Sequence, residues 1–207
     1  MPWRALGRLQ LEVGSRCTGV MVGPRQVLTA AHCLVAPQSR ALVQPGTIHF
    51  LPGYDRGTAR GHARGTAYQV GPGFDPARGG PAPADWALVT LDASLGTPDR
   101  ILPLLRGPVP PRTPLMLGGY QQDRPETLLA DTGCHLLGLS ASGPGAMLLH
   151  DCAGTRGSSG APVLARDAAG GWAVAGIASR VAGSVALGAA VPAAAIAAAL
   201  ALPPPGR

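Results

Sequence analysis

Two short stretches decide the fold of this chain, Thr29-Ala30-Ala31-His32-Cys33 near its start and Gly157-Ser158-Ser159-Gly160-Ala161-Pro162 far downstream. The first places a histidine directly beside a cysteine. The second sets a serine among small residues, where the backbone can turn sharply and direct its amide groups at a bound molecule. Between them, Asp85 precedes the apolar run Trp86-Ala87-Leu88-Val89. A base, a carboxylate and a nucleophile in the order His, Asp, Ser are the components of a serine-hydrolase triad.

The three candidate residues have distinct expected roles. A serine hydroxyl is a poor nucleophile at neutral pH, so the serine needs a base within hydrogen-bonding reach. His32 is the candidate base, because an imidazole can take up and return a proton near neutral pH. Asp85 would hold the imidazole tautomer and stabilise the imidazolium without taking the proton itself. Asp75 and Asp92 are the alternative carboxylates, and Asp85 is preferred because it directly precedes a strand-like run.

The composition favours an all-β fold. The 207 residues suffice to bury a core in one large domain or two small ones. The 30 Gly and 22 Pro break the sequence into short apolar runs with few helical periods, a pattern typical of β-proteins. Six runs precede the proline-rich stretch at 107–111, which we expect to be an extended linker, and six follow it. The runs are Leu9–Val13, Cys17–Val22, Gln26–Ala30, Thr47–Leu51, Ala67–Val70, Trp86–Leu91, Leu115–Gly118, Gly133–Leu139, Ala146–Asp151, Ala161–Leu164, Trp172–Ser179 and Val185–Ala189.

At these motifs the chain resembles the chymotrypsin-fold serine peptidases. It is closer to the secreted bacterial trypsin-like and V8-like members than to the animal digestive enzymes, and the likeness runs from about Leu9 to Leu202. The resemblance implies two six-stranded antiparallel β-barrels, a short C-terminal helix and an active site in the cleft between the barrels. Residues 1–106 would form the barrel that carries the histidine and the aspartate. Residues 107–113 would be the linker, and residues 114–207 would form the barrel that carries the serine, plus the helix.

The implied function is a serine endopeptidase that hydrolyses protein or peptide substrates through an acyl-enzyme. In the family pattern Gly-x-Ser-Gly-x-Pro the nucleophile is Ser159, and the N–H groups of Gly157 and Ser159 would form the oxyanion hole. Ser158 stands where the digestive enzymes have an aspartate that pairs with a newly cleaved N-terminus. We therefore expect a hole that is preformed or supported by other contacts. The alternative function is a catalytically inactive homologue that serves as a protein-binding module.

The resemblance also places residues that would bind substrate. Ser179 matches the serine that hydrogen-bonds the triad aspartate, and the backbone of Arg180 and Val181 would pair with an extended substrate strand.

The primary pocket would have Ala153 at its base, six residues before the nucleophile, so the carboxylate that selects Arg or Lys is missing. The alternative is Asp151, which is close in the sequence and would take this place if a local insertion changed the alignment. Thr155 and Arg156 at the pocket mouth could favour an acidic residue. Glutamyl peptidases usually have a histidine where this chain has Ala178, and we expect a small or apolar residue in the pocket.

The four cysteines allow three pairings. Cys17 and Cys33 flank one expected hairpin, and Cys134 and Cys152 flank another. We expect these two bridges, each contributing roughly 3 kcal/mol in the chain-entropy model.

A Cys₂His₂ zinc site that adds His135 and His150 is the alternative to the second bridge. Adjacent residues of a strand point to opposite faces, which disfavours a site that needs both Cys134 and His135. We therefore expect two solvated histidines, no metal and no other cofactor. His49 and His62 are expected to be ordinary surface or strand residues.

Charge and hydropathy limit the possible partners. The net charge of +6 comes entirely from arginine, and Arg56, Arg60 and Arg64 lie in a Gly-containing segment without interleaved aromatic residues. We expect a solvated loop or strand there and no nucleic-acid partner. The apolar stretch from Ala189 to Leu202 is too short to span a bilayer and reads as a terminal helix, so we expect no membrane insertion. We also expect a monomer.

Two disulfides require an oxidising compartment, so we expect a secreted or periplasmic protein. Met1–Arg8 has no apolar core long enough for a signal peptide, and we expect the export segment to lie upstream of this chain. The alternative is a cytoplasmic protein with reduced cysteines.

Overall fold

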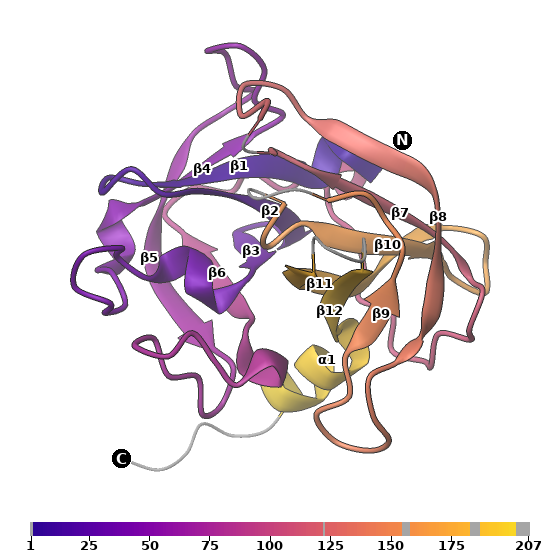
Figure 1. Cartoon of the computed structure of the whole chain (residues 1–207). Helices are drawn as coiled ribbons and strands as arrows, with labels where there is room; N and C mark the ends of the chain where they lie inside the picture. Colours follow the sequence, from indigo (N-terminus) through magenta and orange to yellow (C-terminus); the bar gives the residue numbers. More distant parts are fainter. Residues whose placement is uncertain (1, 122, 155–157, 183–186, 202–207) are drawn as a thin grey trace.

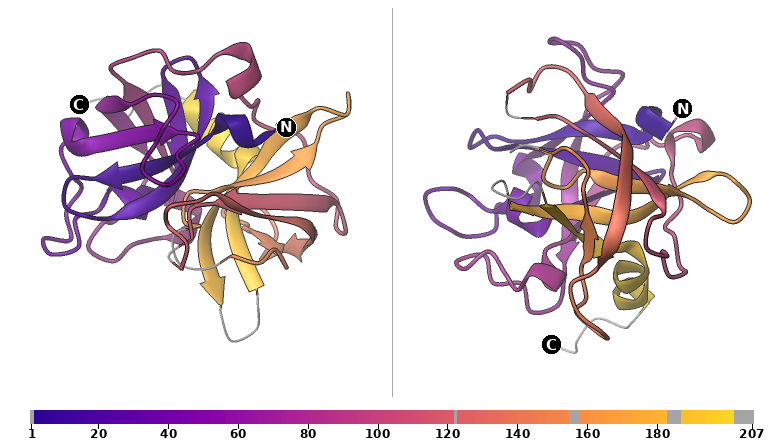
Figure 2. Two further views of the ribbon diagram at one scale, coloured as in Figure 1. Left: turned by 90° about the horizontal axis from the view of Figure 1, so that it is seen from above. Right: turned by 45° about the vertical axis from the view of Figure 1, so that its right-hand side comes forward.

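The computed structural model describes residues 2–121, 123–154, 158–182 and 187–201. In this part of the chain, twelve strands form two closed six-stranded antiparallel β-barrels that lie side by side (Figure 1). Seen from above, the barrels form two adjoining lobes, with the N-terminal segment near their junction (Figure 2). The predicted fold class, all-β with two barrels and a short C-terminal helix, is confirmed.

The first barrel is built around Phe50, whose side chain is fully buried. Gly7 and Gly19 on neighbouring strands leave room for this ring, because a Cβ at Gly7 would lie 2.5 Å from it and one at Gly19 would lie 3.2 Å from it. The strands hydrogen-bond around the barrel in the order β1-β2-β3-β6-β5-β4. They are β1 (Leu6–Leu11), β2 (Arg16–Gly23), β3 (Gln26–Thr29), β4 (Ile48–Pro52), β5 (Ala63–Val70) and β6 (Ala87–Leu91).

The second barrel repeats this architecture, with strands paired in the order β10-β11-β12-β9-β8-β7. Its interior is lined by aliphatic side chains such as Leu115, Leu136 and Val163, none more than 1% exposed. The strands are β7 (Pro114–Gly119), β8 (Leu129–Leu139), β9 (Leu148–His150), β10 (Pro162–Arg166), β11 (Trp172–Ala182) and β12 (Leu187–Pro192).

The chain already contacts the second barrel before it reaches the predicted linker. Leu104 forms a parallel bridge with Val174 of β11, and the N–H of Leu105 donates to the carbonyl of Val174 at 2.8 Å. The predicted division of the chain at a linker of residues 107–113 stays a prediction.

The helices are few and short. The 3₁₀ turns are η1 (Pro2–Ala5), η2 (Ala31–Leu34), η3 (Pro45–Thr47), η4 (Ala82–Ala84) and η5 (Pro98–Arg100), and the α-helix is α1 (Ala193–Ala201). The helix begins four residues later than the expected start at Ala189, because β12 continues to Pro192 through pairs such as Val191 with Ile177 of β11. Ile196 is fully buried and anchors α1 to the body. No helix of the described residues is long and apolar enough to cross a membrane.

Two strands begin four residues before their apolar runs. β5 starts at Ala63 and β8 at Leu129, four residues before the predicted starts in each case. The added residues include polar side chains and a glycine, and this Gly65 is nevertheless paired with Leu91 of β6. Backbone pairing within a barrel does not require an apolar side chain, so a prediction from hydrophobicity alone underestimates the length of these strands.

The disulfides join Cys17 to Cys33, with an S–S distance of 2.03 Å, and Cys134 to Cys152, with an S–S distance of 2.07 Å. This pairing matches the prediction from the two hairpins. The two sulfur atoms that the zinc alternative needed as ligands are therefore joined in a disulfide. Of its two histidines, only His135 is solvent-exposed. His150 is 1% exposed, so the expectation of a solvated histidine is wrong there: β9 directs it inward with Leu148.

Candidate active site

His32 lies in η2, the single turn that follows β3. Ala30 and Ala31 before it are fully buried, and Cys33 after it is bridged to Cys17 of β2. The turn is therefore fixed on both sides, by small residues packed in the core and by a covalent link to the neighbouring strand. The imidazole itself is 33% exposed and can meet a molecule from solvent.

Asp85 follows η4 and is the direct partner of His32. Its Oδ1 accepts the backbone N–H of His32 at 2.9 Å, and its Oδ2 lies 2.7 Å from Nδ1 of the His32 ring. A carboxylate can only accept, so this contact places the proton of a neutral His32 on Nδ1 and leaves the lone pair on Nε2. The alternative carboxylates are engaged elsewhere: Asp75 accepts from the N–H of Ala77, and Asp92 from that of Arg64.

Ser179 reaches the same carboxylate from the second barrel. Its Oγ donates to Oδ2 of Asp85 at 2.5 Å, although the two residues are 94 positions apart in the sequence. The pairing of β11 with β12 shifts register between Ala178 and Arg180, so Ser179 is an extra residue in a bulge. Bulges re-aim side chains, and this one turns Ser179 toward the first barrel.

The ionisation of Asp85 is set by opposing effects. Burial at 1% exposure raises the pKa of this carboxyl, but the hydrogen bonds from His32 and Ser179 and the charge of His32 outweigh it. The pKa of Asp85 consequently lies below its ordinary value. The group is a carboxylate at neutral pH and can stabilise a positive charge on His32.

Ser159 lies at the contact between the barrels. Its carbonyl accepts the N–H of Thr18 at 3.0 Å, and Thr18 directly follows the bridged Cys17. The backbone around Ser159 is thereby connected to the same strand and disulfide that fix His32. Among the hydrogen bonds of the described residues, none joins the Ser159 hydroxyl to His32. In enzymes without substrate such bonds are often long and shorten only when substrate binds.

Gly160 allows this close approach. Its φ is +76°, and a Cβ there would collide with Oγ1 of Thr29 and the carbonyl of Thr18 and would lie 2.9 Å from the N of Ala30. A glycine next to the nucleophile candidate is therefore required both by its backbone conformation and by the packing of the first barrel.

Ser158 and Ser159 differ in exposure. Ser158 is 2% exposed, and a Cβ at Gly154 would lie 2.9 Å from its Oγ, so this side chain packs inside the second barrel. Ser159 is half-buried. This difference supports Ser159 as the serine that can meet a substrate.

The expected substrate-binding residues are only partly visible. Thr155, Arg156 and Gly157 lie outside the described residues. Ala153 is exposed, and its N–H donates to Oδ2 of Asp131 on β8 at 2.8 Å. The exposed Arg180 donates from Nη2 to the carbonyl of Gly79 in the first barrel at 2.6 Å.

Val181 follows on β11 and is 47% exposed. This end of the strand is accessible, as a substrate-pairing segment must be.

Thr18 was not singled out from the sequence, although it contacts both barrels. Besides its N–H bond to Ser159, its Oγ1 accepts the N–H of Tyr120 at 2.9 Å, and its carbonyl accepts the hydroxyl of Thr29 at 2.8 Å. In the sequence, only its position next to Cys17 pointed to a role for Thr18 near the candidate site.

His150 is a second residue whose environment the sequence did not reveal. Within the part of the chain that the structure describes, neither ring nitrogen has a hydrogen-bond partner, and a Cβ at Gly188 of β12 would lie 2.6 Å from Nε2. Burial lowers the pKa of His150, and the nearby Asp151 and Asp131 only partly oppose this effect. The folded protein thus holds a neutral imidazole where the unfolded chain can take up a proton.

We expect His150→Leu to weaken the dependence of stability on pH. A lowered pKa in the folded state means that the unfolded state binds more protons below about pH 6.5, so the wild type loses stability as the pH falls from there. One proton accounts for at most about 1.4 kcal/mol per pH unit. Urea unfolding at pH 7 and pH 5 measures the effect, with His135→Leu as the exposed control. An equal loss of stability in the wild type and His150→Leu would contradict the prediction.

Comparison with known proteins places this geometry in a family. A family model described as a trypsin-like peptidase domain matches residues 17–177. The glutamyl endopeptidase of Bacillus licheniformis is 33% identical over 97 residues, which make up 46% of this chain and 28% of that protein. The match thus spans less than a third of the relative's length.

Solved structures agree on the fold. A Glu endopeptidase solved in complex with MPD superimposes with a TM-score of 0.76 at 20% identity, covering 95% of this chain and 88% of that one. Human heparin binding protein gives a TM-score of 0.74 at 20% identity, covering 100% and 96%. The two barrels and the family match together define the class: this chain belongs to the trypsin-like peptidase domain family.

Proposed function

We propose that the protein is a serine endopeptidase that acts through His32, Asp85 and Ser159. The observation that carries the proposal is the contact of His32 with a buried, ionised Asp85, itself held by Ser179 from the barrel that supplies Ser159. This arrangement leaves Nε2 of His32 as the one ring nitrogen able to accept a proton. The barrel-to-barrel hydrogen bond of Ser159 to Thr18 supports the pairing of this base with that serine.

In the proposed reaction, Oγ of Ser159 attacks the carbonyl carbon of a peptide bond while its proton passes to His32 Nε2. The imidazolium, stabilised by Asp85, then gives this proton to the leaving amine as the C–N bond breaks. Water attacks the resulting acyl-enzyme with His32 again as base, and the acid product leaves with Ser159 restored. The N–H groups of Gly157 and Ser159 would stabilise the oxyanion that forms in each step.

We propose protein or peptide substrates that add an extended strand along Arg180 and Val181. The exposure of Val181 and of the Arg180 side chain supports this site. The primary pocket is proposed to involve Ala153, Thr155 and Arg156. None of these residues is acidic, so a preference for Arg or Lys is not expected.

The two disulfides support a location outside the cytoplasm, in an oxidising compartment. We propose a secreted or periplasmic protein, in line with its membership of a peptidase family.

The second candidate function is an inactive, protein-binding homologue. The observation in its favour is that no hydrogen bond of the described residues joins Ser159 to His32. A fluorophosphonate probe separates the two functions, because it reacts only with an activated serine. We expect intact mass spectrometry to find one adduct on the folded, oxidised protein and none on Ser159→Ala. A folded wild type without an adduct would leave the binding function as the better conclusion.

A further inference from the structure

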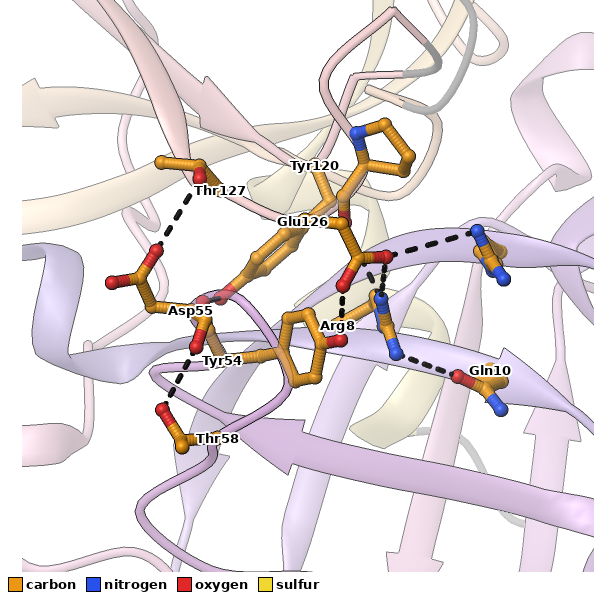
Figure 3. Close-up of polar contacts among 10 residues, drawn as sticks. Arg8, Gln10, Tyr54, Asp55, Thr58, Tyr120, Glu126 and Thr127 are labelled. Atoms are coloured by element: carbon orange, nitrogen blue, oxygen red, sulfur yellow. Dashed lines mark hydrogen bonds and ion pairs between the residues drawn. The ribbon is translucent and has the colours of Figure 1, made fainter.

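A cluster of four residues that does not include the candidate triad connects the barrels. We call Arg8, Tyr54, Tyr120 and Glu126 the inter-barrel clamp (Figure 3). Arg8 lies on β1 and Tyr54 follows β4, so both belong to the first barrel. Tyr120 and Glu126 lie between β7 and β8 of the second barrel.

Glu126 is the centre of the clamp. Its Oε1 accepts a hydrogen bond from Nη1 of Arg8 at 2.9 Å, and its Oε2 accepts one from the hydroxyl of Tyr54. Arg16 lies near the same carboxylate, with Nη1 3.9 Å from Oε1. The backbone adds a further link, because the carbonyl of Glu126 accepts the N–H of Arg56 at 2.7 Å. The segment between β7 and β8 is thus fastened to the first barrel by both charge and backbone.

Arg8 needs this partner because its charge is buried. The residue is 6% exposed, and its guanidinium lies 3.5 Å from the centroid of the Tyr54 ring. Its Nη2 donates to Oε1 of Gln10 at 2.9 Å, whereas its Nε has no partner among the described residues. A buried cation without its counter-charge is strongly unfavourable, so Glu126 is held at this position by the first barrel itself.

Tyr120 carries the connection toward the nucleophile candidate. Its hydroxyl donates to the carbonyl of Tyr54 at 2.9 Å, and its N–H donates to Oγ1 of Thr18 at 2.9 Å (Figure 3 shows the first contact). The N–H of Thr18 in turn donates to the carbonyl of Ser159 at 3.0 Å. The neighbouring Gly119 packs closely against Thr18, because a Cβ there would lie 2.8 Å from Oγ1 of Thr18, and it would be in ordinary contact with Cα of Ser158 at 3.4 Å.

We propose that the inter-barrel clamp positions Ser159 relative to His32, so that Arg8, Tyr54 and Glu126 are positioning residues for the reaction. This inference rests on the proposed function. The two residues lie on different barrels, and small errors in their relative placement reduce turnover strongly. A shift of about 1 Å can cost about a hundredfold in rate. The clamp fixes this placement through a continuous series of contacts from Glu126 by way of Tyr54, Tyr120 and Thr18.

The test compares Glu126→Gln and Tyr54→Phe with the wild type. Glu126→Gln removes the counter-charge of Arg8, and Tyr54→Phe removes only one hydroxyl and keeps the ring and the carbonyl that Tyr120 contacts. The control is Asp99→Asn, which removes an exposed ion pair with Arg4 of 2.8 Å that has no link to Thr18. Each variant is assayed for kcat, KM and the rate of fluorophosphonate labelling at a temperature where it is folded.

We expect Glu126→Gln to lower kcat and the labelling rate by about ten- to a hundredfold with little change in KM, and Tyr54→Phe to have a smaller effect in the same direction. Asp99→Asn should behave like the wild type. If Glu126→Gln does not fold, Tyr54→Phe decides alone. Variants that melt earlier but keep kcat and the labelling rate would overturn the inference, since the clamp would then be structural only. A wild type that is not labelled would overturn the proposed function and this inference with it.

Discussion

Replacing Ser159 with alanine is expected to lower kcat/KM by about 10⁴- to 10⁶-fold, because the variant has no oxygen that can form the acyl-enzyme. His32→Ala should have an effect of similar size, since the hydroxyl then has no base. Residual activity should come from substrate binding and the oxyanion hole. Initial rates on a fluorogenic peptide library, with burst kinetics to detect the acyl-enzyme, measure these losses.

The matched control is Ser158→Ala. Ser158 is adjacent in sequence and has the same side chain, but it is 2% exposed and packs beside Gly154. We expect Ser158→Ala to reduce activity far less than Ser159→Ala. Equal losses, or a larger loss at Ser158, would show that the nucleophile is wrongly assigned.

Combining the changes tests whether the residues act as one unit. Ser159→Ala and His32→Ala remove the same proton-transfer step, so the double variant should be about as active as either single variant. Losses that multiply would mean that His32 and Ser159 act independently, and the proposed mechanism would be wrong.

Asp85→Asn is expected to lower kcat by about 10⁴-fold. The carboxylate accepts from Nδ1 of His32 at 2.7 Å, whereas an amide can also present an N–H there. The imidazole would then carry its proton on Nε2 and could not accept one from Ser159. The fold should survive, because the amide oxygen can still accept the N–H of His32 or the hydroxyl of Ser179.

The controls for this variant are Asp75→Asn and Asp92→Asn. These carboxylates accept from the backbone N–H groups of Ala77 and Arg64, and no hydrogen bond or ion pair of the described residues joins them to His32. We expect both variants to keep kcat within a few-fold of the wild type. A large loss in either, with activity retained in Asp85→Asn, would mean that the wrong aspartate was chosen.

The pH dependence of stability follows from the lowered pKa of Asp85. A carboxyl whose pKa is lower in the folded state stabilises the fold above its unfolded pKa of about 3.9, and this contribution is lost as the pH falls. Asp85→Asn should therefore resist acid denaturation relatively better than the wild type below about pH 4. Urea unfolding of both proteins from pH 6 to pH 3 measures the difference, and parallel curves would contradict it.

The two motifs carry the family resemblance from which the class of fold and the candidate triad were predicted. His32 and Ser159 lie in short stretches whose residue types are typical of one kind of chemistry. The cysteines flank hairpins, so their pairing could also be deduced locally. Boundaries were less predictable: the alanine-rich stretch from Ala189 was expected to be helical, but β12 pairs with β11 up to Pro192. Alanine fits either structure, and the pairing with β11 selected the strand.

The sequence was thus informative wherever a property depends on neighbours along the chain, as for strands, hairpins and the two motifs. Other features depend on how the barrels dock. The bond from Ser179 to Asp85 joins residues 94 positions apart, and that from Arg8 to Glu126 joins residues 118 positions apart. The first contact was expected only from the family resemblance, and the second was not predicted, because both contacts form when two separately patterned barrels pack together. The burial of His150 was also missed, although it arises within one barrel, where β9 pairs with β12 and the ring packs against Gly188.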